Sequence, residues 1–276
     1  MKILSDLISN FDVCSLKVSF EDEGATILEA NEIISMAHSS GILATVKVGG
    51  PEAKSDILTC ANLGVDNIVA PMVESRFAAR KFIDACKLEK HILQSSSFYV
   101  NGFAKGIVVG RSDLSKSLGL TKSETDSEVV FDLTKSALAI AKNSGLQTTV
   151  GGSINSNSYD FIKNLYDLGL LDRIETRLVI CNLNDEVMTF ENFNRFIDLS
   201  IGLEKYILER RLSQALSKKD TIEKRIASIS GRVGFLKQVS DNEKNVIVLD
   251  FDNVIHDMTM GYHDGTIYGT PIVGTK

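Results

Sequence analysis

The sequence predicts an α/β protein in which a parallel β-sheet is covered by helices. Apolar runs with strand character alternate along the chain with segments of helical periodicity. Strand, helix, strand repeated at similar intervals is the pattern of a parallel sheet. A chain of 276 residues with 43% hydrophobic and 24% charged residues is long enough for a large α/β domain with a full core.

Six segments are expected to be strands, because they are short, apolar and rich in β-branched residues. They are residues 16–20, 44–48, 67–73, 106–110, 147–150 and 174–180. Two segments between them carry apolar residues near a 3.6-residue spacing, from Ile27 to Ala37 and from Leu133 to Ala141. Each of these segments is expected to form a helix with one buried face.

Polar, glycine-rich segments follow the first five predicted strands. They are residues 21–24, 49–50, 74–75, 111–113 and 151–153, while Glu175–Arg177 falls inside the last predicted strand. In a parallel barrel or a doubly wound sheet, functional residues lie just past the carboxyl ends of strands. Turn formation and helix capping would explain any one of these loops equally well. Five at equivalent places favour a shared site.

The C-terminal third has a different pattern. Residues 199–230 carry a long apolar stripe opposite a charged face, which predicts an amphipathic helix. This helix either lies across its own domain or reaches a neighbouring subunit, and we expect a homo-oligomer. The polar segment 238–244 breaks the periodicity and predicts a boundary near 235–244. The expected domains are therefore residues 1–235 and a short segment, 245–276, that opens with a strand.

Composition excludes several classes of protein. The net charge of −6 argues against a nucleic-acid partner, which needs a surplus of Lys and Arg, and a small-molecule substrate fits better. No segment is apolar enough for a signal peptide or a membrane span, so we expect a cytoplasmic protein without a membrane partner. The four cysteines are far apart in the sequence and are expected to be reduced packing residues.

Three motifs in order resemble one family of barrel enzymes. Residues 47–53 (KVGGPEA), 68–75 (IVAPMVES) and 106–115 (GIVVGRSDLS) together resemble the HpcH/HpaI aldolase and citrate lyase family of the phosphoenolpyruvate/pyruvate barrel superfamily. Residues 150–153 and 171–177 extend the similarity, which covers about residues 15–215. The resemblance implies a TIM-barrel-like (β/α)8 fold, either complete or short of a strand unit.

The resemblance also implies a metal-dependent carbon–carbon lyase or aldolase that acts on a 2-oxo acid or a related enolisable carboxylic acid. Mg²⁺ or Mn²⁺ would act as the Lewis acid. The metal ligand implied first is Asp113, with Glu74 as the nearest second carboxylate. Lys47 stands where many members carry a catalytic arginine, and Arg111 could grip a substrate carboxylate or pair with Asp113. Substrate contacts are expected from the glycine-rich loops and the last motif: Gly49, Gly50, Gly151, Gly152, Ser153 and Arg177.

The sequence departs from this family between Arg76 and Lys105. Relatives usually place a strand there that ends in a metal-binding Glu, and no such strand is visible in this interval. Only six strands are recognisable before residue 200, two short of a closed barrel, unless a segment such as Ser97–Val100 contributes one. The alternative to a lyase is therefore a catalytically degraded barrel that binds a ligand or serves as a scaffold in a larger bifunctional protein.

Residues 248–254 (VLDFDNV) resemble the first motif of haloacid dehalogenase-like phosphatases. That family uses the first aspartate as a nucleophile and the second as a general acid, with Mg²⁺ between them, which here implies Asp250 and Asp252. A capped loop after an edge strand is the alternative explanation. Too few residues follow Asp252 for the rest of such a fold, so we expect no phosphatase activity from this chain alone.

Overall fold

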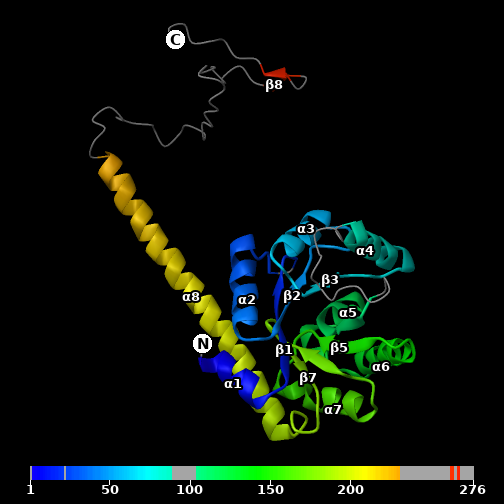
Figure 1. Ribbon diagram of the computed structural model, residues 1–276. Coiled ribbons are helices and arrows are strands. Elements are labelled where there is room, and N and C mark those ends of the chain that lie inside the picture. The colour runs from blue at the N-terminus through cyan, green and yellow to red at the C-terminus, as the bar shows by residue number, and fades with distance from the viewer. Residues whose placement is uncertain (1, 22, 89–103, 231–261, 264–265, 268–276) are drawn as a thin grey trace. The chain divides into compact units, whose positions relative to one another are not determined.

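We describe a computed structural model, shown in Figure 1, over residues 2–21, 23–88, 104–230, 262–263 and 266–267. The chain divides into two compact units, Met1–Leu212 and Ser213–Lys276. The boundary expected near 235–244 and the strand expected at 245–250 lie outside the described residues. The two expected domains, residues 1–235 and 245–276, therefore stay a prediction.

The first unit is built on a seven-stranded mixed sheet with the order β3-β2-β1-β7-β6-β5-β4. Its strands are β1 (Val13–Ser19), β2 (Leu43–Lys47), β3 (Asn67–Val69), β4 (Gly106–Gly110), β5 (Gln147–Gly151), β6 (Arg173–Glu175) and β7 (Val179–Asn182). β1, β2 and β3 pair in parallel, and so do β4, β5 and β6. In the second unit, β8 (Tyr262–His263) and β9 (Thr266–Ile267) form a short antiparallel pair.

The prediction of one strand over residues 174–180 was wrong, because the chain reverses in the middle of it. β6 ends at Glu175, and β7 returns antiparallel to β6 and then pairs antiparallel with β1. Thr176 closes the turn: its amide donates to the Val179 carbonyl at 2.9 Å, and its hydroxyl accepts from the Val179 amide at 3.1 Å. Arg177 consequently lies in a turn and not inside a strand.

Helices alternate with the strands as expected. They are α1 (Lys2–Asn10), α2 (Ile27–Ser39), α3 (Lys54–Asn62), α4 (Arg76–Leu88), α5 (Arg111–Ser117), α6 (Glu128–Asn143), α7 (Tyr159–Asp167) and α8 (Phe190–Ser230), with short 3₁₀ turns η1 (Lys122–Glu124) and η2 (Ser156–Ser158). α2 and α6 confirm the two predicted helices, and Thr26 and Glu29 form a capping box at the start of α2. The sequence argument did not find α1.

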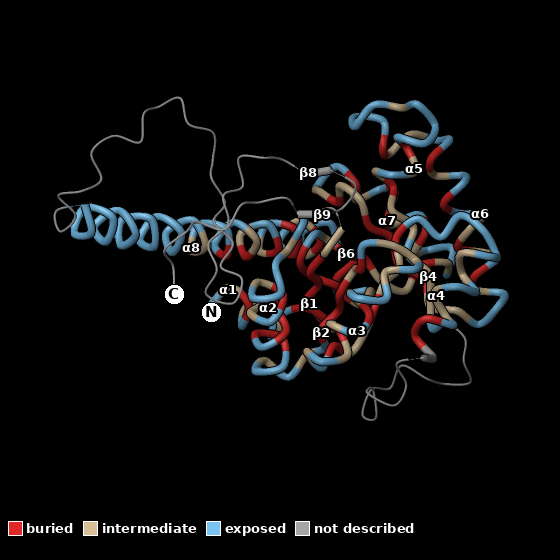
Figure 2. Tube along the Cα trace, turned by 90° about the horizontal axis from the view of Figure 1, so that it is seen from above, coloured by how far each residue is buried: buried red, intermediate tan, exposed pale blue. Residues whose placement is uncertain are grey.

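The two faces of the sheet differ in polarity. One face is apolar and belongs to the hydrophobic core, with Leu16, Val46 and Ile174 among its members. The other, which we call the inner face, carries polar side chains that are also buried: Ser15, Lys17, Ser19, Thr45, Thr149 and Glu175. Figure 2 shows the strands as buried segments among the helices. A polar face that is this well shielded indicates a sheet curled toward itself, as in a barrel.

Within the described residues, the curled sheet ends at β3 on one side and at β4 on the other. The gap falls at the interval where the sequence lacks the expected strand. Residues 89–103, which include Ser97–Val100, lie outside the described part. The α/β fold with a curled, TIM-barrel-like sheet and a long C-terminal helix is therefore confirmed; over the described residues the sheet is open, and one strand is reversed relative to a regular (β/α)8 barrel.

The long helix α8 begins earlier than the predicted 199–230, at Phe190. Its N-terminal half buries Phe193, Phe196, Leu203 and Ile207 in the core of the first unit. This confirms that the helix packs across its own domain over that half. Among the described residues, no helix combines the length and apolarity needed to cross a membrane.

The cysteines behave as packing residues. Cys60, Cys86 and Cys181 are buried, and all four thiols are free. Burial raises the pKa of Cys60 to about 12, with Asp56 adding to the effect, and raises the pKa of Cys86 to about 11. These groups are therefore neutral thiols at physiological pH.

Replacing Leu203 by Ala tests the packing of α8. Because Leu203 is 1% exposed, Leu203→Ala should lower the free energy of unfolding by about 2–5 kcal/mol in urea denaturation. Leu28→Ala removes the same atoms from a side chain that is 82% exposed and should cost less than about 0.5 kcal/mol. Equal effects of the two substitutions would contradict this packing.

Candidate active site at the carboxyl edge of the sheet

Six strands end at one edge of the sheet. β7 runs antiparallel to both β1 and β6, so the two parallel groups point in the same direction. The carboxyl ends of β1 to β6 therefore share one edge, where barrels carry their functional residues. The structure brings to this edge the site residues predicted in the first unit: Lys47, Gly49, Gly50, Glu74, Arg111, Asp113, Gly151, Gly152, Ser153 and Arg177.

Lys47 is the last residue of β2, and its side chain belongs to the inner face. Its Nζ lies 2.6 Å from Glu21 Oε2, in the loop after β1, and the side chains are 20% and 25% exposed. A partly exposed ammonium group with one carboxylate partner stands at the rim of the site. It can still donate to a further oxygen, because an ammonium has three donors.

A buried ion pair lies one side-chain layer below Lys47. Lys17 Nζ donates to Glu175 Oε1 at 2.5 Å, and the side chains are 10% and 9% exposed. The other oxygen, Glu175 Oε2, is buried and has no hydrogen-bond partner among the described residues. A buried carboxylate oxygen without a donor is costly and uncommon, so it marks a position where function is a reasonable explanation.

Lys17 was not among the site residues predicted from the sequence. Its signal was the alternation of Ser15, Lys17 and Ser19 along a strand whose other residues are apolar. Such alternation indicates a polar face. The partner of Lys17 could not be read from the chain, because Glu175 comes from a strand that is 158 residues away.

Two glycines make this arrangement possible. A Cβ at Gly151 would lie 2.6 Å from Glu175 Cγ, so only glycine leaves room for that side chain. Gly152 has φ +80°, and a Cβ there would lie 2.6 Å from the Ser112 amide nitrogen at the start of α5. Both glycines thus have a packing reason, and their predicted contact with substrate stays a prediction.

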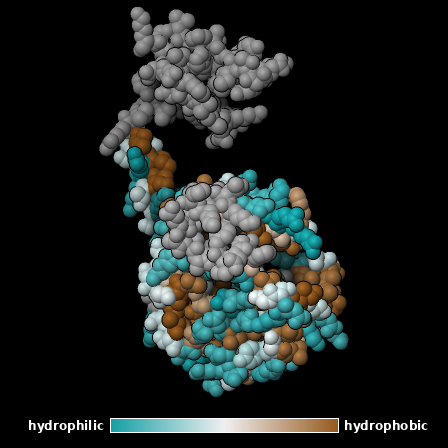
Figure 3. Space-filling view, turned by 45° about the vertical axis from the view of Figure 1, so that its right-hand side comes forward, coloured by the Kyte–Doolittle hydropathy of each residue, from teal (hydrophilic) through white to brown (hydrophobic). Residues whose placement is uncertain are grey.

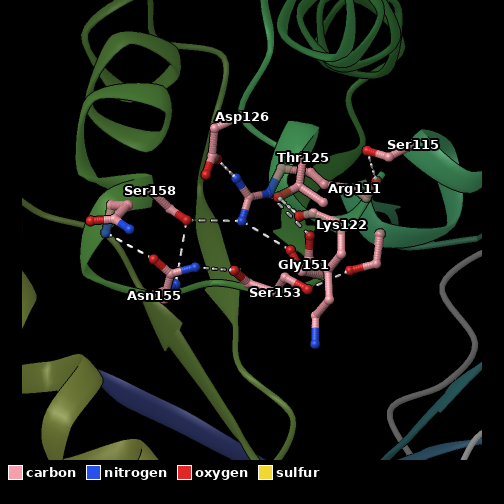
Figure 4. A network of polar contacts seen from close by, with 12 residues as sticks. Arg111, Ser115, Lys122, Thr125, Asp126, Gly151, Ser153, Asn155 and Ser158 are labelled. Carbon is pink, nitrogen blue, oxygen red and sulfur yellow. Dashed lines mark hydrogen bonds and ion pairs between the residues drawn. The ribbon is translucent and has the colours of Figure 1, made fainter. Parts of the chain in front are cut away.

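Arg111 is fully buried and holds the loop after β5 in place, as Figure 4 shows. Its guanidinium donates to the Gly152 carbonyl at 2.9 Å and to Ser158 Oγ at 3.1 Å, and it pairs with Asp126. The guanidinium also lies 4.8 Å from the centre of the Phe161 ring. Burial lowers the pKa of Arg111 and Asp126 opposes that effect, but the group stays charged.

The ion-pair partner of Arg111 is therefore Asp126 and not Asp113, the partner that one of the two alternatives for Arg111 named. With these donors engaged and no exposed surface, Arg111 positions the loops around it. The contact between Ser112 Oγ and Ser153 Oγ, at 2.8 Å, adds a second link between α5 and this loop. Ser153 itself has φ +53°, a conformation that side chains other than glycine adopt rarely.

The described carboxylates do not form a ready metal site. Asp113 is 64% exposed, and its ion-pair partner is Lys116, at 3.7 Å on the same helix. Glu74 is exposed in the loop before α4. In the described ranges, no three His, Cys, Asp or Glu side chains lie together as metal ligands. Because Mg²⁺ requires an octahedral set of oxygens, this donor set does not fit a preassembled magnesium site.

The remaining predicted residues belong to the rim. The Gly49 amide donates to Asp56 Oδ2 at 2.7 Å, which ties the loop after β2 to α3. Gly50 lies next to it in the same loop. Arg177 is half-exposed, with its Nε 3.9 Å from Glu23 and 3.8 Å from Glu204. Asp250 and Asp252 lie outside the described residues.

Comparisons with known proteins support the fold. No family model and no curated protein matches the chain. Among solved structures, an HpcH/HpaI aldolase from Desulfitobacterium hafniense DCB-2 matches with a TM-score of 0.50 and 14% identity, over 63% of this chain and 80% of that one. A citrate synthase variant, SbnG, matches with a TM-score of 0.45 and 16% identity, over 80% and 89% of the two chains.

The first likeness agrees with the aldolase-barrel resemblance of the sequence. At 14% identity it establishes a common fold and carries over no activity. The fold is therefore that of an α/β barrel-like protein, and its carboxyl edge brings Lys47, Lys17 and Glu175 together as a candidate site.

Replacing Arg111 tests its positioning role. Arg111→Met removes the guanidinium and leaves Asp126 and two carbonyls without their donor, so the free energy of unfolding should fall by about 3–5 kcal/mol. The measurement is equilibrium denaturation in urea. Arg177→Met, at a side chain that is 52% exposed, should cost less than about 1 kcal/mol. A loss from Arg111→Met no larger than this control would show that Arg111 does not hold the loops.

Proposed function

We propose that this chain is a carbon–carbon lyase of the aldolase kind, acting on a 2-oxo acid or a related enolisable carboxylic acid at the carboxyl edge of the sheet. The observation that supports this most is the buried Lys17–Glu175 pair with its free Glu175 oxygen. The aldolase-like fold and the polar inner face agree with it. In this proposal Glu175 is the general base.

Glu175 has the chemistry that a proton transfer requires. Breaking the carbon–carbon bond of a 4-hydroxy-2-oxo acid needs a base that takes the 4-hydroxyl proton as the bond breaks to an aldehyde and an enolate, and the same group can return that proton to the enolate carbon to give pyruvate. Glu175 Oε1 is held by Lys17, so the carboxylate is oriented while Oε2 stays open to a proton. Gly151 leaves room for the Glu175 side chain to adopt this position.

The lysines supply the positive charge that an enolate needs. Lys47 at the rim would bind the substrate carboxylate or the developing enolate oxygen, and Lys17 would stabilise charge from the layer below. A preorganised cation in a partly buried site stabilises a developing oxyanion more than water does. Glu21 orients Lys47 through their 2.6 Å ion pair.

Metal dependence is implied by the family resemblance of the sequence alone. The described carboxylates do not assemble around Asp113, so no step here is assigned to a metal. Asp113 and Glu74 remain candidates for contacts to the substrate, or to a cation whose other ligands are water or substrate oxygens.

Turnover tests the roles of Lys47 and Glu175. We expect pyruvate release from at least one member of a panel of 4-hydroxy-2-oxo acids, followed by a coupled dehydrogenase assay. Glu175→Gln should lower kcat by about 100-fold or more, because it removes the base. Lys47→Met should lower kcat/KM by a similar factor, and Lys47→Arg should restore much of it because the charge is kept.

Lys163→Met provides the matched control. Lys163 forms an ion pair with Asp167 on α7, as Lys47 does with Glu21, and its loss should leave turnover unchanged. Activity that survives both Glu175→Gln and Lys47→Met would refute the proposed site.

Divalent cations test the metal part of the prediction. Because the described donor set is incomplete, Mg²⁺ or Mn²⁺ at millimolar concentration should leave the melting temperature of the wild type unchanged and the same as that of Asp113→Ala. The measurement is a thermal melt followed by circular dichroism. A rise in melting temperature with metal that disappears in Asp113→Ala would favour the metal-dependent mechanism instead.

A second candidate is a barrel that binds a carboxylic acid without turnover. The burial of Arg111 against Asp126 and the exposure of Asp113 favour it, because neither side chain is placed as a lyase requires. Pyruvate binding by calorimetry that is lost in Lys47→Met, with no turnover of any panel member, would select this candidate over the lyase.

A further inference from the structure

The C-terminal half of α8 carries an apolar stripe that the described part of the chain leaves exposed. The stripe consists of Leu208, Leu212, Leu216, Ile222, Ile226 and Ile229, whose exposed fractions lie between 48% and 60%. Figure 2 shows this half of the helix as exposed, and Figure 3 shows brown apolar side chains on its surface. Large apolar residues repeated along one exposed helix face indicate an interaction surface.

The stripe fits a heptad repeat in which Leu216 takes an e position, while Ala215 and Lys219 fill the d and a positions between Leu212 and Ile222. Leu212 and Ile226 occupy a positions of a heptad repeat, and the d positions follow at a regular distance. The full series is Leu208 (d), Leu212 (a), Ala215 (d), Lys219 (a), Ile222 (d), Ile226 (a) and Ile229 (d). Alternating steps of three and four residues over three heptads produce a continuous seam, which a second helix can cover.

We propose that this seam pairs with the same seam of a second copy of the chain, as a parallel two-stranded coiled coil over Leu208–Ile229. The pairing does not depend on the proposed lyase function. It assigns an occupant to an apolar face that the described part of the chain does not cover.

The charges beside the seam select the parallel direction. In a parallel pair, a g residue faces the e residue five positions later in the other helix. Lys218 (g) would then face Glu223 of the partner subunit, and the symmetry of the dimer forms this pair twice. Arg211, the other g residue near the start of the seam, already pairs with Glu29 and Glu32 on α2 and takes no part in this pairing.

The antiparallel direction places like charges together. When the same a and d residues are paired antiparallel, Lys218 faces Lys218 of the partner subunit. Glu209 then faces Glu223 of the partner subunit. Each contact is repulsive, so the charge pattern disfavours this arrangement.

Lys219 is the polar residue in the middle of the seam. A single polar a position lowers stability but fixes register and favours two strands. In the proposed dimer it lies between Leu212 and Ile226, and its intrahelical partner Glu223, at 3.7 Å, can hold its charge toward solvent. A one-heptad slip would move Lys219 against apolar residues.

Sedimentation equilibrium of the full chain tests the dimer. The expected mass is twice that of the 30.2 kDa chain at micromolar concentrations. The double variant Ile222→Glu, Ile226→Glu should weaken dimerisation by at least about 100-fold, since it buries charge in the seam. Gln214→Glu, outside the seam on the same helix, should leave the mass unchanged.

Circular dichroism distinguishes loss of the dimer from loss of folding. The double variant should keep the thermal transition of the barrel, because the seam lies outside the core cluster. A wild-type chain that is monomeric throughout the concentration range would overturn the proposal. So would a double variant that remains a dimer.

Cross-linking tests the direction. Ala215→Cys places a thiol at a d position, where the two parallel helices bring the same residue together, so mild oxidation should give a disulfide-linked dimer. An antiparallel pair would place residue 215 beside residue 219 and would give no such product. A dimer by mass without this cross-link would overturn the parallel arrangement.

Discussion

The ion pair between Lys17 and Glu175 is the interaction on which the arrangement of the site depends. Lys17 belongs to the first group of parallel strands and Glu175 to the second, and β7 runs between them in the opposite direction. The reversed strand supplies the backbone hydrogen bonds that join the groups, while the ion pair joins them on the inner face. Breaking such a pair would leave a buried charge without compensation. In the proposed mechanism, the same ion pair also orients the general base.

Arg111 performs the corresponding task at the loop after β5. Its bonds to Gly152, Ser158 and Asp126 fix the start of α5 against that loop. The motif that identifies the barrel in the sequence is thus used largely for architecture, and its aspartate, Asp113, faces solvent. The groups suited to chemistry come from other strands, because the curled sheet brings the ends of β1, β2 and β6 to one edge. This division is consistent with the proposal that Lys17 and Lys47 stabilise the negative charge of the substrate.

The long helix has two apolar faces that differ in burial. One face begins at Phe193 and is buried in the core of the first unit as far as Ile207. The second face, from Leu208 to Ile229, follows a heptad spacing and is exposed. In the sequence the two faces read as one stripe, because both have apolar residues three or four positions apart. Only burial distinguishes the segment of α8 that packs in its own domain from the segment that we propose pairs with a second copy.

The sequence by itself determined the α/β class, five of the six predicted strands, helices α2 and α6, and the placement of polar loops after strands. These features depend on local periodicity, which a chain carries wherever it folds. The tertiary structure alone decided the reversal at Thr176, the pairing of Lys17 with Glu175 and the choice of Asp126 as partner of Arg111. A reversal inside an apolar run leaves the alternation of residues nearly unchanged, and an ion pair between residues 158 positions apart exists only once the sheet has curled.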